Sequence, residues 1–323
     1  MIAARLLVVL SLPGWIAFAA PASAQKYPEH PVRVVVAFPT GASQILGLLV
    51  SEKLRDAWKQ PVVPDFKPGA AGNVAAETVA KAPADGYTLL LTSPSIAISP
   101  HLFKKLGYDA TRDLVAVAPL AAVPNIMIVH PSVPAKTLQE LAQLARANPG
   151  KLNYASSGVG SSNHLAGELF SSLAKVKMTH VPYKGAAIAM TAMLSGEVDV
   201  VVSTVPATIP HITAGKLRGL AVLAPERVSA LPQIPTSAEE GMPELVVITW
   251  YGLFAPAGVK HEVIERVNGE VTRFMAAPDT KAQLAKVELD ARTGTPAEFG
   301  KFVRDETERW GRVIREANIR TEQ

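Results

Sequence analysis

Apolar and polar positions follow one another in blocks that fit strands leading into helices. Residues 34–36 (VVV) form a short apolar run of the kind that makes a buried strand, and residues 39–41 (PTG) make a turn. Beyond the turn, apolar residues recur at helical spacing, at Ile45, Leu49, Leu54 and Trp58. The pattern predicts a buried strand that feeds a helix through a loop of small residues.

Such a loop suits an anion. The first turn of a helix has unpaired backbone N–H donors and a partial positive charge, and small residues let a ligand approach them. We therefore expect the ligand at residues 34–44, and we expect it to carry a carboxylate or a similar anion. The alternative is an ordinary strand-to-helix loop that binds nothing, and this stretch alone leaves both interpretations open.

Alternation of strands and helices continues along the chain. Further strands are predicted at residues 60–63, 87–92, 153–156, 179–182, 198–203 and 217–224, and helices at 74–81, 164–173, 186–195 and 261–276. A capping box at 137–140 (TLQE) opens another helix. The last helix starts at the cap Thr295, and we expect it to pack on the first domain through an apolar stripe of Phe299, Phe302, Val303, Trp310 and Ile314.

Two apolar stretches look like connections between domains. Residues 114–130 contain Pro119 and Pro124, and we interpret them as two strand pieces that cross into a second domain. Residues 246–255 are the predicted return crossing. The fold class is then α/β, with domain 1 at 25–124 and 248–323 and domain 2 at 125–247. Two such halves joined by two crossings enclose a central cleft, as in a hinged solute-binding protein.

Composition narrows the class of protein. A chain of 323 residues is long enough for two domains, and with 48% apolar and 19% charged residues it is globular. The formal net charge is +4, without any run of lysine or arginine. Dispersed positive charge argues against nucleic acid as a partner and is compatible with collecting small anions.

The N-terminus indicates export. Arg5 precedes an apolar run at residues 6–20, and Ala22-Ser23-Ala24 is a small-x-small cleavage site. We interpret residues 1–24 as a secretory signal peptide, cleaved near Ala24, and expect a periplasmic protein. A membrane anchor is the alternative, but the run is short for a bilayer. Because there is no cysteine, disulfides, cysteine-bound metals and a lipid at the cleavage site are excluded.

Five segments together resemble one known family. They are FPTGAS (38–43), KPGAAGNVAAETVAKAPADGYTLL (67–90), SSGVGSSNHLAGELF (156–170), HVPYKGAAIAMTAMLSGEVDVV (180–201) and WYGLFAPAG (250–258). With them the chain resembles the periplasmic solute-binding proteins of tripartite tricarboxylate transporters, the Bug or TctC-like family, over nearly all of the mature chain. The resemblance implies a two-domain, periplasmic-binding-protein-like (type II) fold. It also implies a monomer that delivers a small organic acid to a membrane permease, without cofactor, metal or chemistry on the solute.

The resemblance also implies a set of site residues. The first domain would hold the solute through Phe38, Thr40, Gly41, Ala42 and Ser43. The second domain would contribute Ser157, Gly158, Ser161, Tyr183, Lys184 and Thr204. Ser93 and Ser95 join the set from their position after a predicted strand, because open α/β sheets bind ligands at the carboxyl ends of their strands. We expect N–H groups of the two glycine-serine loops to hold one carboxylate from both sides, with some contacts bridged by water.

One departure from the family pattern bears on specificity. The first loop looks one residue shorter than usual, and Gln44 stands where the family has an aspartate. A neutral residue there makes an amino-acid ligand less favoured and a plain di- or tricarboxylate more favoured. Ser203 and Thr204, at a position that often carries another aspartate, point the same way.

Several of these residues also have an ordinary structural interpretation. Lys184 could be a solvated surface lysine, and Tyr183 could pack the hinge instead of covering the ligand. His164, at a helix start, is better explained as structural. Trp250 and Tyr251 lie on the return crossing and are better explained as hinge packing.

Other function classes find less support. Gly158-Val-Gly160 begins like a dinucleotide-binding loop, but Asn163 stands where the third glycine is needed. No Gly-x-Ser-x-Gly or HExxH motif occurs, so an exported hydrolase is a weak alternative. A solute-sensing partner of a membrane receptor would use the same cleft, and the sequence does not separate it from a transport protein.

Overall fold

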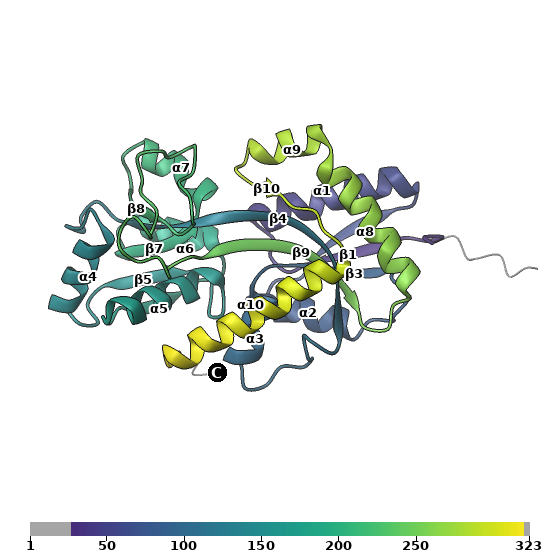
Figure 1. The fold of residues 1–323 in the computed structure, drawn as a ribbon, viewed down its shortest axis with the longest axis horizontal. Coiled ribbons are helices and arrows are strands. Elements are labelled where there is room, and N and C mark those ends of the chain that lie inside the picture. Colours follow the sequence, from purple (N-terminus) through teal and green to yellow (C-terminus); the bar gives the residue numbers. More distant parts are fainter. Residues whose placement is uncertain (1–26, 320–323) are drawn as a thin grey trace, which may run out of the picture.

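The computed structural model describes residues 27–319, so the signal-peptide prediction lies outside the described residues. Strands follow one path through two lobes, in the order β2-β1-β3-β9-β4-β7-β5-β6, and β8 and β10 also pair with β4 (Figure 1). Their bounds are β1 Val32–Val36, β2 Val62–Phe66, β3 Thr88–Thr92, β4 Leu114–Val129, β5 Asn153–Ser156, β6 Thr179–Pro182, β7 Val200–Thr204, β8 Arg218–Val222, β9 Ile248–Pro256 and β10 Asp290–Ala291.

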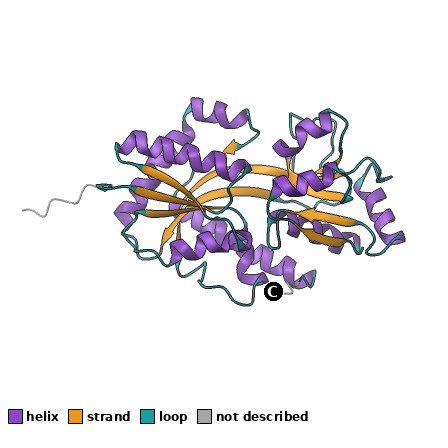
Figure 2. Cartoon of the chain, turned by 180° about the vertical axis from the view of Figure 1, so that it is seen from behind, coloured by secondary structure: helices purple, strands orange, loops and turns teal. Residues whose placement is uncertain are grey.

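Helices cover both faces of each lobe (Figure 2). They are α1 Gly41–Trp58, α2 Asn73–Ala80, α3 Ser95–Leu102, α4 Leu138–Ala147, α5 Ser162–Ala174, α6 Ala186–Leu194, α7 Val205–Thr213, α8 His261–Ala276, α9 Pro278–Ala285 and α10 Pro296–Glu316. We call the part built on β1, β2 and β3 the first lobe, and the part built on β5 to β8 the second lobe. This is the two-domain α/β arrangement that the sequence predicted.

Alternation along the strands explains this layering. In β3, Leu89 and Leu91 pack with α1 and α8 on one face, whereas Leu90 packs with α2, α3 and α10 on the other. All three leucines are fully buried. Burying a leucine stabilises the fold by roughly 1.5–3 kcal/mol, so a sheet covered on both faces favours continuous apolar runs. The second lobe repeats the scheme, with α4 and α5 on one face and α6 and α7 on the other.

Strands β4 and β9 connect the lobes. The prediction of two separate strand pieces at residues 114–130 is wrong, because β4 is a single strand that pairs with β9 in the first lobe and with β7 and β8 in the second. Proline cannot donate to a ladder. The ladder tolerates Pro119 because its register shifts on both sides, between Ala116 and Ala118 and between Pro119 and Ala121.

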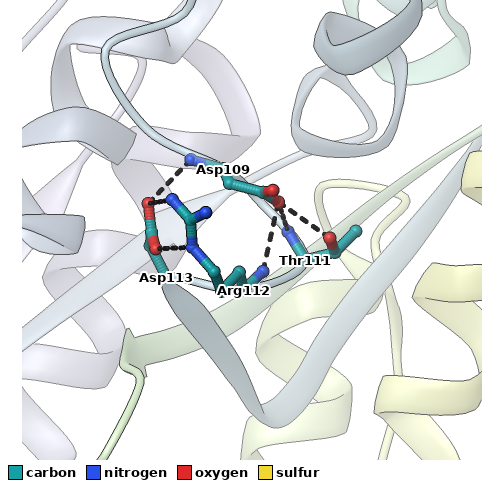
Figure 3. A network of polar contacts seen from close by, with 4 residues as sticks. All are labelled: Asp109, Thr111, Arg112 and Asp113. Atoms are coloured by element: carbon teal, nitrogen blue, oxygen red, sulfur yellow. Dashed lines mark hydrogen bonds and ion pairs between the residues drawn. The ribbon is translucent and has the colours of Figure 1, made fainter.

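A polar turn fixes the entry to β4 (Figure 3). The Asp109 carboxylate accepts hydrogen bonds from Thr111 N at 2.9 Å, Thr111 Oγ1 at 2.7 Å and Arg112 N at 3.2 Å. The Asp113 carboxylate accepts from Asp109 N at 2.8 Å and pairs with the Arg112 guanidinium. At this turn, side-chain oxygens thus accept from backbone N–H groups that make no hydrogen bond within a strand or helix.

Helix α10 packs on the first lobe, as the sequence predicted, and it also contacts the second lobe. Phe299 belongs to the first-lobe core, whereas Trp310 and Ile314 belong to the cluster that contains Leu138 and Leu165 of the second lobe. The start agrees with the prediction: Thr295 and Glu298 form a full capping box. Phe302 was expected to face inward, but it is 42% exposed and covers Phe299 and Trp250 from outside.

Other differences concern short helices. No helix was predicted after the strand at 198–203, but Thr204 caps α7 and Pro206 occupies its first turn, where a missing N–H is harmless. Helix α3, which starts at Ser95, and helix α9 were not predicted either. These helices have eight or nine residues, so they show few helical repeats for a pattern to detect.

Candidate functional site

The carboxyl ends of strands from both lobes point to the place where β4 and β9 cross between them. In the first lobe, Thr92 ends β3 and pairs with Gly252 of β9. In the second, Thr204 ends β7 and pairs with Asn125 of β4. Residues 123 and 249 of the two crossing strands pair with each other between these points. The loops that follow β1, β3, β5 and β7 therefore open toward one region, which is the usual ligand position in open α/β sheets.

The β1–α1 loop offers free backbone donors. Helix α1 starts at Gly41, and its cap residue Thr40 makes no side-chain capping bond. No other residue among 27–319 accepts from the N–H groups of residues 41–43. Gly41 has φ +65°, and a Cβ built on it would meet nothing within 4 Å. The geometry leaves three N–H groups and open space at a positive helix end, which suits a carboxylate.

Side chains of the first-lobe candidates differ in what they can reach. Thr40 and Gln44 are exposed, and Ala42 is half-buried. Phe38 packs beside Gly72, where an added Cβ would lie 3.3 Å from the Phe38 ring. Ser43 is 2% exposed and its buried Oγ has no hydrogen-bond partner among residues 27–319, so only its backbone N–H can serve a solute. Ser93 and Ser95 are buried at the start of α3, without a side-chain hydrogen bond to another described residue.

The β5–α5 loop is built around the cap Ser161. Its Oγ donates to Gly158 O at 2.7 Å and accepts from His164 N at 3.3 Å. Both roles of this hydroxyl are therefore used inside the loop, and it is not a donor for a solute in this conformation. The N–H groups of Ser162 and Asn163 have no accepting partner among the described residues, so they are the donors that this loop offers.

A buried histidine, His164, and a half-buried one, His180, support that loop. The rings of His164 and His180 lie 4.1 Å apart, and Gly160 N donates to His164 Nδ1 at 3.3 Å. Burial, with a smaller contribution from His180, lowers the pKa of His164 to about 3, and burial lowers the pKa of His180 to about 4. Both rings are therefore neutral at neutral pH. His164 acts here as a structural residue that holds the loop backbone.

The remaining second-lobe candidates divide into two kinds. Tyr183 donates its hydroxyl to Glu197 at 2.7 Å, and desolvation together with this bond raises the pKa of Tyr183 to about 12. Its hydroxyl is therefore engaged within its own lobe. Lys184 is exposed, and Gly185 beside it has φ +114° with nothing within 4 Å of a built Cβ. Thr204 is half-buried and its hydroxyl bonds to no other described residue, so it remains a donor toward the crossing.

A polar cluster that sequence reasoning missed lies at the crossing itself. Asn125 is fully buried in β4, and its Nδ2 donates to Val247 O and to Thr249 Oγ1, each at 2.9 Å. Ser162 Oγ lies 3.0 Å from Thr249 Oγ1, and Asn163 Nδ2 donates to Asn125 Oδ1 at 3.4 Å. The available signal was Asn125 itself, a polar residue inside an apolar strand.

Two cavities lie elsewhere. One of about 530 Å³ is lined by the start of α2 and by residues 103–108, and one of about 300 Å³ lies beside β8 in the second lobe. The predicted site residues line neither of them. The contact of Gly160 with Phe103, at 3.1 Å from a built Cβ, shows where the second-lobe loop meets the first lobe.

Comparisons with known proteins agree on one family. The family model described as "Tripartite tricarboxylate transporter family receptor" matches residues 48–319. The protein BugT of Bordetella pertussis is 34% identical over 322 residues, which covers 98% of both chains. Within residues 27–319, no helix is long and apolar enough to span a bilayer.

Solved structures give the same result at the level of the fold. "R. palustris Rpa4515 with adipate" superposes with a TM-score of 0.85 at 33% identity, over 91% of this chain and 99% of that one. MatC (Rpa3494) from Rhodopseudomonas palustris, with bound malate, has a TM-score of 0.81 at 29% identity, over 89% of this chain and all of that one. The similarity extends over both lobes and the crossing strands.

Proposed function

We propose a transport role for this chain, which belongs to the tripartite tricarboxylate transporter receptor family. It captures a small carboxylate-bearing solute between its two lobes and delivers that solute to the permease subunits of a tripartite transporter. The observation that carries the proposal is the convergence of free backbone donors. N–H groups of residues 41–43 and of Ser162 and Asn163 belong to loops that open toward the same crossing.

Backbone donors explain the class of solute. A carboxylate has lone pairs enough for donors from both lobes, and two helix N-termini add favourable charge. A solute held from both sides binds the closed arrangement of lobes better than any other, so it shifts the protein toward closure. Adipate and malate in the related structures are both dicarboxylates, and we extend this class to the present chain.

The site in this proposal keeps all fourteen residues named from the sequence, with roles adjusted to their surroundings. Gly41, Ala42 and Ser43 act through their backbone N–H groups. Thr40, Ser93, Ser95, Ser157 and Thr204 offer hydroxyls. The residues at the edge of the site are Phe38, Gln44, Gly158, Ser161, Tyr183 and Lys184, and the N–H of Gly158 is already bonded to Ser156 Oγ. Domain 1 comprises residues 25–124 and 248–323, and domain 2 comprises 125–247. The protein acts as a periplasmic monomer and leaves its solute chemically unchanged.

Thermal unfolding with a panel of di- and tricarboxylates tests the binding step. A ligand present at about 100 times its Kd stabilises the folded state by roughly 2.7 kcal/mol, so a true ligand gives a clear, concentration-dependent rise in Tm. Ligand-stripped protein is needed, because a retained solute would mask the shift. If no organic acid in the panel changes Tm, the proposed class of solute is wrong.

Uptake measurements test the delivery step. Cells that express the permease with this protein should accumulate the labelled ligand, and cells that lack the protein should not. A ligand that binds tightly in solution but whose uptake is unaffected by loss of the protein would assign it to sensing instead of transport.

A further inference from the structure

A chain of side-chain hydrogen bonds runs from the crossing strands to the β5–α5 loop. It begins at the backbone carbonyl of Val247, which accepts from Asn125 Nδ2 at 2.9 Å. Asn125 Oδ1 in turn accepts from Asn163 Nδ2 at 3.4 Å, and Asn163 Oδ1 accepts from Ser157 Oγ at 3.0 Å. The chain ends at Ser157, one of the residues that the sequence placed in the solute site.

The buried end of this series of hydrogen bonds determines which atom of each pair donates and which accepts. A backbone carbonyl can only accept, so the atom of Asn125 that faces Val247 O must be the amide nitrogen. The other end of the Asn125 amide is then an oxygen, and the Asn163 atom that faces it must again be the nitrogen. Asn163 therefore turns its oxygen toward Ser157. Reversing either amide would place two oxygens against each other in a buried position, which is unfavourable.

This polarity determines the role of the Ser157 hydroxyl. Its single hydrogen is donated to Asn163 Oδ1, so any further hydrogen bond to Ser157 Oγ must be accepted by its lone pairs. A carboxylate only accepts, so it could bond to Ser157 Oγ only if the hydroxyl turned away from Asn163. Asn163 Oδ1 would then lose the hydrogen bond that it accepts from Ser157. A hydroxyl group on the solute can make it, because a hydroxyl donates.

Ser157 lies where such a solute hydroxyl would be close to a bound carboxylate. The side chain of Asn163, to which Ser157 bonds, belongs to the first turn of α5, and that turn carries the free N–H groups of Ser162 and Asn163. Ser157 is half-buried, so the residue is not closed off from solvent. A carboxylate on the helix end and a donor on Ser157 are therefore neighbours.

We propose that Asn125, Asn163 and Ser157 form a specificity relay that makes the site select carboxylic acids bearing a hydroxyl group near the bound carboxylate over the same acids without it. The inference rests on the proposed function, since it concerns the same site. Asn163 and Asn125 are positioning residues that act through Ser157, and Ser157 is the residue that touches the solute.

Calorimetric titration with matched pairs of acids tests the relay. The probes are succinate with malate, and glutarate with 2-hydroxyglutarate, because each pair differs by one hydroxyl. We expect the native protein to prefer the hydroxylated member of the better-fitting pair by about tenfold, the value of one good hydrogen bond. Ser157→Ala removes the acceptor and should bring the two affinities together.

Asn163→Ala tests whether Ser157 selects the solute because Asn163 holds its hydrogen, or simply because Ser157 touches the solute. It frees the Ser157 hydrogen to point at a carboxylate, so affinity for the unsubstituted acid should rise relative to the hydroxylated one although Ser157 is still present. The ratio of two affinities on one variant cancels any general weakening of the loop. Ser171→Ala is the matched control, since Ser171 lies on the same helix and donates to Gly167 O instead. Its ratio should equal that of the native protein.

Two failures are distinguishable. If none of the four acids nor any other carboxylate binds, the proposed function itself is wrong. If acids bind but the native protein shows no preference for a hydroxyl, or Asn163→Ala leaves the ratio unchanged, carboxylate binding stands and the relay is overturned.

Discussion

Ser156 Oγ lies 2.7 Å from Nε2 of His180, and the same hydroxyl accepts from Gly158 N at 3.1 Å. A half-buried imidazole thus holds the residue at which β5 ends and the loop to the solute site begins. His180 stacks on Tyr154 on one side and contacts His164 on the other. The protonation state of this pair is therefore linked to the stability of the lobe that carries the loop.

Stability should fall as the medium becomes acidic. Burial lowers the pKa of His164 to about 3 and of His180 to about 4, whereas an unfolded histidine titrates near 6.5. Below pH 6.5 the unfolded chain takes up protons that the folded protein does not, so the free energy of unfolding drops as pH falls toward 4. The slope reaches about 1.4 kcal/mol per pH unit for each histidine.

Urea unfolding at pH 8, 6.5 and 5 measures this slope. His180→Gln should reduce it, whereas replacement of His261, whose side chain is 87% exposed, should not. An equal slope in the native protein and in both variants would mean that the pair of His164 and His180 does not control the acid response.

Gly41→Val should abolish solute binding without unfolding the protein. The added side chain would enter the open space beside the free N–H groups, where the anion is expected. A residue with φ +65° also strains any β-branched side chain, so a loss of about 1–2 kcal/mol in stability accompanies the change.

Gly215 provides the matched control, because it has φ +67° and also nothing within 4 Å of a built Cβ, but lies in the turn after α7. Gly215→Val should show the same loss of stability with unchanged affinity in a titration. Retained binding by Gly41→Val would remove the β1–α1 loop from the site.

Ser43→Ala should stabilise the free protein and leave affinity unchanged. Its hydroxyl is buried without a partner in the described part of the chain, and removing an unsatisfied polar atom recovers roughly 1 kcal/mol. Because only the backbone N–H of Ser43 can reach a solute, the ligand loses nothing. Chemical unfolding and calorimetry measure the two quantities. A drop in affinity would show that the hydroxyl turns toward the solute on binding.

Glu306→Ala should weaken the contact between α10 and the crossing strand β9 and so lower the free energy of unfolding. Glu306 Oε2 accepts from both Trp250 Nε1 and Trp310 Nε1 at 3.2 Å, and its other oxygen pairs with Arg309. Without the carboxylate two buried indole N–H groups lose their partner, which costs about 2–4 kcal/mol of unfolding free energy. Glu308→Ala, at an exposed position of the same helix, should change stability by less than about 0.5 kcal/mol in the same unfolding experiment.

Much of the fold was readable from local pattern. Residues 153–156 and 179–182 were predicted as strands with the bounds that the structure has. The cap Thr295 was predicted correctly because the chemistry of a helix cap is local. The box at 137–140 is only partly formed: Thr137 caps α4, but the Glu140 carboxylate accepts from Lys136 N.

The sequence by itself determined the alternation of strands and helices, the glycines that open the loops and the family signature, since each depends on residues close together in the chain. Only the tertiary structure decided what the polar side chains do. In the folded protein Ser161 is hydrogen-bonded within its own loop, and the Tyr183 hydroxyl donates to Glu197. Asn125 accepts a hydrogen bond from Asn163, which is 38 residues further along the chain. The physical reason is that a hydrogen-bond donor is committed by whichever acceptor folding places beside it, and spacing along the chain carries no record of that neighbour.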